Sequence, residues 1–345
     1  MHGDSGIPPY GPVLGAALTG RSGIPVHLVS VIDEPTHLEV FERLAACDVV
    51  GRHVVVTNPD DAEALLFVDL HCVSDPFLRG LRQHPLVRRF RDKVYVYDAR
   101  DVPYFTFPGI YVCGSPRWAS RYRGMVGGPY AELKTDTAIE NGEPDLLFSF
   151  LGSRTHPVRD RVMRLSHPRA SLRDTTEGFG FFEPSHPALE RERAAARRTF
   201  RESIGRAKFV LCPRGFGASS LRLFETLRAG RVPVVISDEW LPPPRIDWDA
   251  CVVRVAEANI SEIPAILESV ESEWERLVMA GRTVLETELG NGRLWNHFVD
   301  SVDDLTDIRR GRRPWWFDRR IVRAHAVSAA RKTPRRGAAI ASRSS

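Results

Sequence analysis

The chain of 345 residues is 43% hydrophobic and 27% charged, which is typical of a globular protein and excludes wholesale disorder. No apolar run approaches the roughly 20 residues that cross a bilayer, and the five scattered cysteines favour buried thiols over a disulfide framework or a zinc site. The charge is uneven, because residues 309–345 carry a net +11 and residues 1–308 carry −7, although the total is +4.

Residues 1–24 contain many glycines and prolines and no apolar period, which predicts a flexible leader without a signal peptide. Strand patterns follow at residues 24–33, 53–58 and 93–99, and helical patterns lie between them. Strands that alternate with helices form parallel sheets covered on both faces. We therefore expect a first α/β domain over residues 25–135.

The same alternation restarts at Asp145 and predicts a second α/β domain over residues 136–308. Its expected elements are a strand, glycine loop and helix over 145–165, a basic helix over 188–207, strands over 208–212, 232–238 and 251–255, and helices over 261–281 and 293–305. A basic helix and tail over residues 309–345 would follow this domain.

The stretch KFVLCPRGFGASSLRLFETLRAGRVPVVISD, residues 208–238, joins two predicted strands through a glycine-containing loop and a helix. Ligands of an open parallel sheet bind beyond the carboxyl ends of its strands, where this loop lies. The helix N-terminus offers unpaired N–H groups, Arg214 can add a bidentate contact, and Ser219 and Ser220 can cap the helix or donate hydroxyls. Gly215 lets the backbone approach a ligand closely. These features predict a phosphorylated ligand.

Arg222 and Glu225 lie three residues apart on the next helix and therefore share one face. A carboxylate one turn beyond a phosphate site suits the two hydroxyls of a ribose, which suggests a nucleotide. The alternative is an i,i+3 salt bridge worth a few tenths of a kcal/mol. A dinucleotide fingerprint would need glycine at Ser220, and the Gly-Lys-Ser or Gly-Lys-Thr of a Walker loop is absent.

This stretch resembles the signature of the exostosin family, glycosyltransferase family 47. The similarity lies in a Lys-Phe-x-Leu-x-Pro-Arg-Gly strand end, a Ser-x-Arg-Leu-Phe-Glu helix and a Gly-x-x-Pro-Val strand ending in Ser-Asp. It extends more loosely over residues 148–289. The His-Asp-x-Gly segment of the family is not plainly present, and VYVYDARDVPYF stands near its place.

The resemblance implies an α/β fold of GT-B type, with two Rossmann-like domains facing a central cleft. It also implies an inverting sugar transfer without a bound metal or other cofactor, from a UDP- or GDP-linked sugar held by the C-terminal domain. The donor-site residues carried over from the family motif are Arg214, Ser219, Ser220, Arg222 and Glu225. In this assignment Arg214 neutralises the leaving diphosphate and Glu225 binds the ribose.

Two further residues stand at strand ends of the same domain. Arg154 follows the first strand and would open into the same cleft, although it could equally be a solvated loop arginine. Asp238 ends a later strand and could contact the donor or serve as a turn or cap residue.

An inverting transfer needs a general base for the acceptor hydroxyl, and the facing domain must supply it. Asp101 and then Asp98, in the turn after VYVY, are the preferred candidates, with Asp33 and His71 behind them. The competing interpretation is that a strand-end aspartate caps a turn or helix, and that His71 is a packed histidine.

The tail pairs Trp315, Trp316 and Phe317 with many arginines. It fits an interfacial helix on an anionic membrane, and the alternative, slightly preferred for the three aromatic residues, is a terminal helix that packs back on the domains. We therefore expect a cytoplasmic enzyme, with peripheral contact to the inner face of the membrane left open, that acts on a glycan or lipid-linked acceptor.

Two other functions stay open at this point. One is a non-catalytic, nucleotide-sugar-binding partner of a polysaccharide-assembly complex, because the segment expected to carry the base has diverged. The other is nucleic-acid binding through the tail, which ranks last because the acidic body offers no second basic surface.

Overall fold

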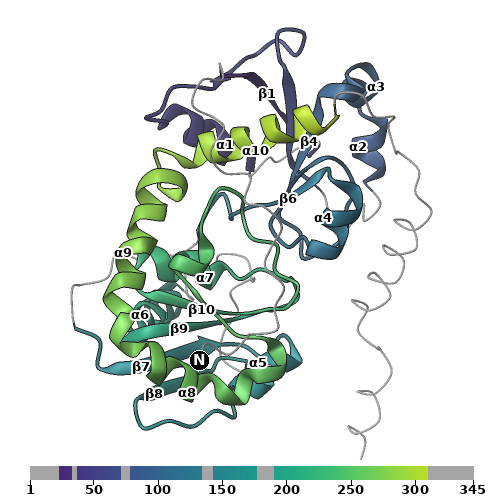
Figure 1. Cartoon of the computed structure of the whole chain (residues 1–345). Helices are drawn as coiled ribbons and strands as arrows, with labels where there is room; N and C mark the ends of the chain where they lie inside the picture. The colour runs from purple at the N-terminus through teal and green to yellow at the C-terminus, as the bar shows by residue number, and fades with distance from the viewer. Residues whose placement is uncertain (1–22, 33–36, 71–77, 134–142, 177–189, 310–345) are drawn as a thin grey trace, which may run out of the picture.

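The computed structural model describes residues 23–32, 37–70, 78–133, 143–176 and 190–309. Figure 1 shows two lobes, one built on strands from the first half of the chain and one on strands from the second half. Most of the predicted leader and nearly all of the basic tail lie outside the described residues. None of the described helices is long and apolar enough to span a membrane.

The first lobe is a six-stranded, fully parallel sheet with the order β2-β1-β3-β4-β5-β6. Its strands are β1 (Pro25–Ser30), β2 (Val54–Val55), β3 (Ala64–Asp69), β4 (Val94–Asp98), β5 (Gly109–Tyr111) and β6 (Met125–Gly127). Its helices are α1 (His37–Ala46), α2 (Arg79–Gln83), α3 (Pro85–Arg89) and α4 (Pro116–Tyr122). Every residue of β3 and β4 is buried, as expected for central parallel strands with both faces covered.

The second lobe is a five-stranded, fully parallel sheet with the order β11-β10-β9-β7-β8. Its strands are β7 (Leu146–Gly152), β8 (Ala170–Asp174), β9 (Ala207–Pro213), β10 (Val232–Ile236) and β11 (Val253–Arg254). The helices are α5 (Pro157–Val162), α6 (Glu190–Gly205), α7 (Leu221–Arg228), α8 (Ile263–Val270) and α9 (Trp274–Val284). The chain order reverses between β7 and β9, and such a switch point is where doubly wound sheets bind ligands.

The carboxyl ends of the two sheets face each other. A Cβ atom added at Gly127, which ends β6, would lie 2.3 Å from the backbone oxygen of Leu241 in the segment after β10. A Cβ atom added at Gly217, after β9, would lie 2.5 Å from Oδ1 of Asp101, after β4. Two parallel α/β sheets with facing carboxyl edges confirm the predicted architecture of two Rossmann-like domains in the GT-B arrangement.

The helix α10 (Leu294–Arg309) corrects the predicted domain boundary, which assigned residues 136–308 to the second domain. In Figure 1 this helix crosses the first lobe. Its Phe298 ring lies 4.9 Å from the ring of Phe41 and 5.3 Å from the ring of Tyr97, and Trp295 Nε1 donates to the backbone oxygen of His53 at 3.2 Å. The apolar period of a helix shows that one face is buried but does not show which sheet buries it.

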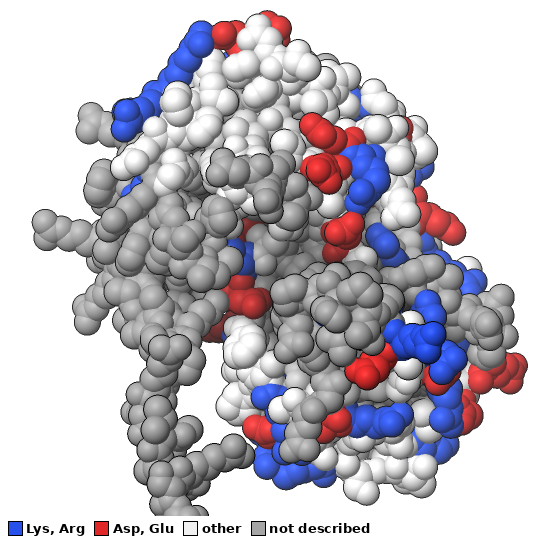
Figure 2. All heavy atoms as spheres, turned by 180° about the vertical axis from the view of Figure 1, so that it is seen from behind, with Lys and Arg blue, Asp and Glu red and all other residues white. Residues whose placement is uncertain are grey.

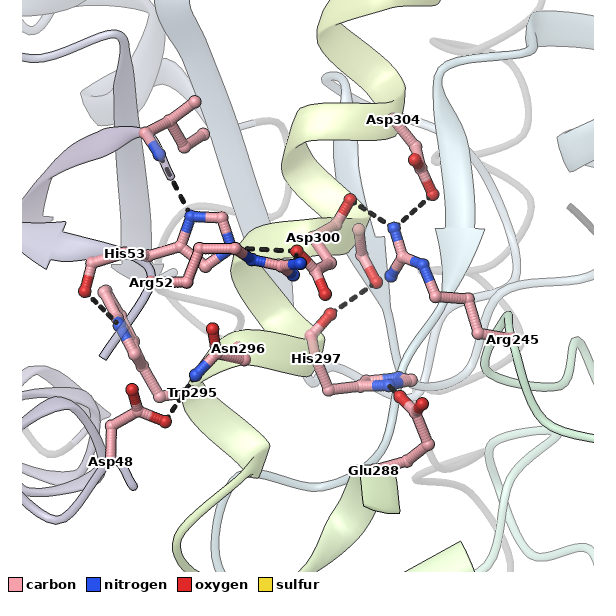
Figure 3. Close-up of polar contacts among 12 residues, drawn as sticks. Asp48, Arg52, His53, Arg245, Glu288, Trp295, Asn296, His297, Asp300 and Asp304 are labelled. Atoms are coloured by element: carbon pink, nitrogen blue, oxygen red, sulfur yellow. Dashed lines mark hydrogen bonds and ion pairs between the residues drawn. The ribbon is translucent and has the colours of Figure 1, made fainter. Parts of the chain in front are cut away.

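A polar network on α10 also joins the two lobes (Figure 3). Asp300 pairs with Arg52 and with His53 of the first lobe. Arg245, from the segment after β10, donates to the backbone oxygen of Asp300 at 2.6 Å and pairs with Asp304. The acidic side chains of this helix therefore pair with an arginine from each lobe, Arg52 and Arg245.

Candidate active site

The candidate site lies at the switch point of the second sheet, where the loops after β7 and β9 are neighbours. Arg159 in the first turns of α5 joins these two loops. Its Nε donates to the backbone oxygen of Arg214 and its Nη1 to the backbone oxygen of Ser153, both at 3.0 Å, while Nη2 reaches the oxygen of Pro213 at 3.4 Å. Burial and the charge of Arg222 lower the pKa of Arg159 to about 10.

Sequence reasoning missed Arg159. The available signal was Pro157, which marks a helix start directly after the strand-end loop and so places Arg159 at the same edge of the sheet. The composition gave no help, because 48 residues of the chain are Lys or Arg and their abundance does not indicate which of them belong to a site.

Arg214 lies where the sequence places it, directly after β9, and its side chain is only 14% exposed. Its Nη1 is 3.3 Å from Glu239 and 3.7 Å from Glu257, so two acids flank the guanidinium. Its Nε is buried and has no hydrogen-bond partner among the described residues. Arg214 therefore has one unpaired donor, and an anion would compete with the two glutamates for the others.

Four polar side-chain atoms in the segment from Arg214 to Ser237 have no hydrogen-bond partner among the described residues. They are Nε of Arg214, Oγ of Ser219, Nε of Arg222 and Oγ of Ser237, and all are buried. Buried polar groups in native proteins are nearly always paired, so each unpaired group needs an explanation. Arg214 and Ser237 directly follow the ends of β9 and β10, and Ser219 lies just before α7, so three of the four atoms belong to the edge of the sheet where a polar ligand can bind.

The two serines do not cap α7 with their side chains. Ser220 occupies the N-cap position in an extended backbone conformation but makes no side-chain hydrogen bond there. Ser219 is buried, and its hydroxyl has no partner among the residues described. Of the two predicted roles, capping is therefore wrong in this structure, and donation of a hydroxyl to a ligand stays a prediction.

The structure places Arg222 beneath the site. Its guanidinium lies 4.6 Å from the ring centroid of Phe150 and 5.5 Å from that of Phe200, and Nη2 donates to the backbone oxygen of Leu151. Burial lowers its pKa. Arg222 thus supports the strand ends and has Nε as an unpaired donor, and its predicted contact with the donor stays a prediction. Glu225 on the same helix is also buried, with 6% exposure.

Arg154 and Asp238 both have partners within the protein, and their contact with a donor stays a prediction. Arg154 is about half exposed and pairs with Asp174 at 2.7 Å and with Asp160 at 3.8 Å, as a surface loop arginine does. The carboxylate of Asp238 accepts the backbone N–H of Glu257 at 2.9 Å, and its own N–H donates to Glu257 Oε1 at 3.3 Å. Asp238 thus joins the end of β10 to the segment after β11.

The two preferred base candidates have different surroundings. Asp98 is 1% exposed, and Arg100 engages both of its oxygens, through Nε at 2.8 Å and Nη2 at 2.5 Å. Asp98 as the base stays a prediction, and this buried ion pair makes it less suitable than Asp101, because its carboxylate is already engaged inside the protein. The candidates Asp33 and His71 lie outside the described residues.

Asp101 is exposed and faces the loop after β9. The Sγ of Cys113 donates to Asp101 Oδ1 at 3.6 Å. Burial and the neighbouring Asp101 carboxylate raise the pKa of the Cys113 thiol to about 12, so the thiol keeps its proton and can act as this donor. Asp101 therefore combines access to solvent with a position opposite the candidate donor loop.

Among the described residues, no group of three or more His, Cys, Asp or Glu side chains is arranged to hold a metal ion.

Comparison with known proteins matches residues 139–270 to the sequence model of the exostosin GT47 domain. An exostosin-1 homolog of Caenorhabditis elegans is 44% identical over 113 residues, which cover 32% of this chain and 27% of the relative. A probable beta-1,4-xylosyltransferase of Arabidopsis thaliana is 39% identical over 77 residues, which cover 22% and 19%. The chain thus spans about a quarter or less of the length of these curated relatives.

Solved glycosyltransferases show only a weak likeness. An alpha1,3-fucosyltransferase is 10% identical with a TM-score of 0.41, covering 88% of this chain and 94% of that one. A glycosyltransferase involved in lipopolysaccharide biosynthesis is 12% identical with a TM-score of 0.35, covering 84% and 100%. At this level the fold assignment rests on the strand order of the two sheets. The sequence match is specific, and the stretch that matches the exostosin GT47 model, residues 139–270, contains the candidate donor site.

Proposed function

We propose that the protein is an inverting, metal-independent glycosyltransferase that moves a sugar from a UDP- or GDP-linked donor to a glycan or lipid-linked acceptor in polysaccharide or oligosaccharide synthesis. The observation that carries this proposal is the pair of unpaired buried polar atoms after β9, Nε of Arg214 and Oγ of Ser219, within the stretch that matches the exostosin GT47 model. The relatives named above include a probable xylosyltransferase, which supports transfer of a sugar as the reaction.

In this proposal the donor diphosphate lies against the N-terminus of α7. The backbone N–H groups there and the Nε of Arg214 face the leaving oxygens, and Arg159 keeps the loop in place. Preorganised donors of this kind stabilise charge as it develops, and loss of one costs about 10²-fold in rate. Because arginines and the helix terminus would carry this charge, the proposed transfer uses no metal. Glu225 is the proposed ribose ligand.

Asp101 is the proposed general base. It would accept the proton of the acceptor hydroxyl while that oxygen attacks the anomeric carbon from the face opposite the diphosphate, which inverts the configuration. The support is its exposure and its position against Gly217 in the donor loop. The hydrogen bond from Cys113 orients the carboxylate.

Thermal shift with UDP, GDP and their common sugar conjugates, with and without magnesium, tests the donor part of the proposal. A ligand at 100 times its Kd stabilises the folded state by about 2.7 kcal/mol, so a true donor nucleotide raises the melting temperature clearly. An equal shift with and without magnesium is expected. No shift with any nucleotide, or a shift that requires magnesium, would contradict it.

Transfer and donor hydrolysis by the same preparation separate an enzyme from the non-catalytic binding partner. Binding of a nucleotide sugar without either reaction would favour the partner. Nucleic-acid binding is not favoured by the described surface, because Figure 2 shows basic and acidic side chains interspersed over the face it displays. A cytoplasmic location, with peripheral membrane contact through the basic tail, stays part of the proposal.

A further inference from the structure

The loop after β9 carries an aromatic side chain in an unusual position. Phe216 is 65% exposed and lies between Gly215 and Gly217. Among the described residues, the other large exposed apolar side chains are four valines around β2 and Met279 on α9, so Phe216 is the aromatic member of this group. A single exposed apolar residue needs no explanation by itself, but the position of this one restricts its role.

The backbone of the loop packs closely against the protein at both of the neighbouring glycines. A Cβ atom at Gly215 would lie 3.1 Å from Arg159 Nη2, on the side of the second sheet. A Cβ atom at Gly217 would lie 2.3 Å from Cys113 Sγ and 2.5 Å from Asp101 Oδ1, on the side of the first sheet. The backbone on both sides of Phe216 is therefore in close contact with protein, and the ring is left exposed on a held loop, one residue from the contact with Asp101.

A sugar ring has the surface that such a phenyl group can bind. The C–H bonds on one face of a pyranose form an apolar patch, whereas its hydroxyls point outward around the ring. An aromatic face covers that patch and leaves the hydroxyls free to reach polar groups, which is how ligand sites combine aromatic walls with a few placed polar atoms. Asp101 is the adjacent polar group that can receive a hydroxyl proton.

We propose that Phe216 is the floor of an acceptor subsite, on which a pyranose ring of the acceptor glycan stacks with its reacting hydroxyl directed at Asp101. The inference rests on the proposed transferase function and goes beyond it by assigning the acceptor side of the site. Its ligand class is a carbohydrate with an unobstructed C–H face.

The test begins with the wild-type chain and the nucleotide sugar selected by thermal shift. Oligosaccharides of xylose, glucose, galactose, glucuronate and N-acetylglucosamine are screened as acceptors, both by transfer and by saturation-transfer NMR. With the best acceptor, the variants Phe216→Ala, Phe216→Leu and Phe216→Trp are compared. Met279→Ala is the matched control, because Met279 is similarly exposed but lies on α9.

Phe216→Ala should raise the acceptor KM about tenfold, the effect of losing one aromatic stacking contact, while the donor KM changes less than twofold. Phe216→Leu should behave like alanine, since it is apolar without a flat ring, and Phe216→Trp should keep the wild-type KM. Wild-type NMR should show saturation transfer to ring C–H protons that weakens in Phe216→Ala.

An unchanged acceptor KM in Phe216→Ala, with transfer intact in the wild type, would overturn the subsite and leave the transferase function standing. A rise in the donor KM instead would assign the ring to the nucleotide. If the wild type binds nucleotide sugar but neither transfers to nor binds any oligosaccharide, the proposed function and the subsite both fall.

Discussion

At the scale of single residues, the proposed chemistry depends on Asp101, and its replacement is the direct test. Asp101→Asn keeps the shape of the side chain and removes its basicity, so kcat for transfer should fall by about 10² to 10⁴, the usual contribution of a general base. Nucleotide binding by thermal shift should remain. Asp92→Asn, at an exposed aspartate just before β4, is the control. Undiminished turnover in Asp101→Asn would remove this assignment.

Arg159 is the second residue whose role can be separated by substitution. Its three contacts go to backbone oxygens of two different loops, so its proposed work is to position Arg214 rather than to touch the donor. Arg159→Lys keeps the charge, but a single ammonium group cannot reach three oxygens that lie in different directions. Arg159→Lys and Arg159→Gln therefore both leave some of these backbone oxygens without a hydrogen bond. Both variants should lower kcat/KM for the donor by about tenfold or more, mainly through kcat.

Arg159→Lys shows whether Arg159 acts by positioning Arg214 or only by its positive charge. Recovery of wild-type kcat by Arg159→Lys would show that charge alone suffices and would contradict the positioning role. Arg164→Gln, at an exposed arginine just beyond α5, controls for a general change in charge. The melting temperature is measured for each variant, so that a loss of folding is not counted as a loss of kcat.

At the scale of elements, α10 makes a prediction about pH. Burial would raise the pKa of Asp300, but the hydrogen bond from His53 and the charges of Arg245 and Arg52 outweigh it and lower this pKa below its ordinary value of 3.8. A lowered folded-state pKa gives stability that is present above the ordinary value and is lost as the pH falls through the folded-state value. Asp300 should therefore stabilise the protein at neutral pH, and this contribution should decline as the pH falls from about 4 through the lower folded-state pKa.

Comparison of the wild type with Asp300→Asn by chemical denaturation measures this effect. The variant should lose about 2 kcal/mol of unfolding free energy at pH 7, because a paired, largely buried carboxylate is removed from its two donors, Arg52 and His53. The difference should shrink as the pH falls below 4. Glu286→Gln, at an exposed glutamate before α10, should show neither effect. A difference that grows on acidification would contradict the assignment.

The elements also show what the sequence could and could not predict. The alternation of apolar runs predicted both sheets, and the motif around Arg214 predicted the binding edge, because both signals are local. The partners of Asp98 and Arg222 were not predictable, since a bidentate pair with Arg100 and stacking on Phe150 depend on side-chain directions. The assignment of α10 to the second domain has a related difficulty, because the tertiary fold and not the helix sequence determines which sheet covers its apolar face.

At the scale of the whole molecule, the proposed reaction needs the two sheets to present their residues to one substrate pair. An apolar cluster continues from one lobe into the other, from Tyr97 and Cys113 to Phe224 and Trp240, and α10 adds its charged contacts to both. The loop after β9 carries the candidate donor residues and Phe216, and it contacts Asp101 directly. The distance between donor and base is therefore set where the domains meet, and Gly217 occupies that contact.

Gly217→Ala tests this dependence. A methyl group would lie 2.3 Å from Cys113 Sγ and 2.5 Å from Asp101 Oδ1, closer than any real contact allows, so the loop or the facing lobe must shift. Catalysis tolerates such displacements poorly, and a shift of about 1 Å can cost about 10² in rate. The variant should still gain stability from the donor nucleotide, because Arg214 and the start of α7 lie on the loop's own side, while transfer falls by at least tenfold. Gly124→Ala, whose added methyl would lie 3.2 Å from the ring of Phe105 and 3.6 Å from the backbone oxygen of Tyr122, is the control. Full transfer by Gly217→Ala would mean that the base lies elsewhere than beside this loop.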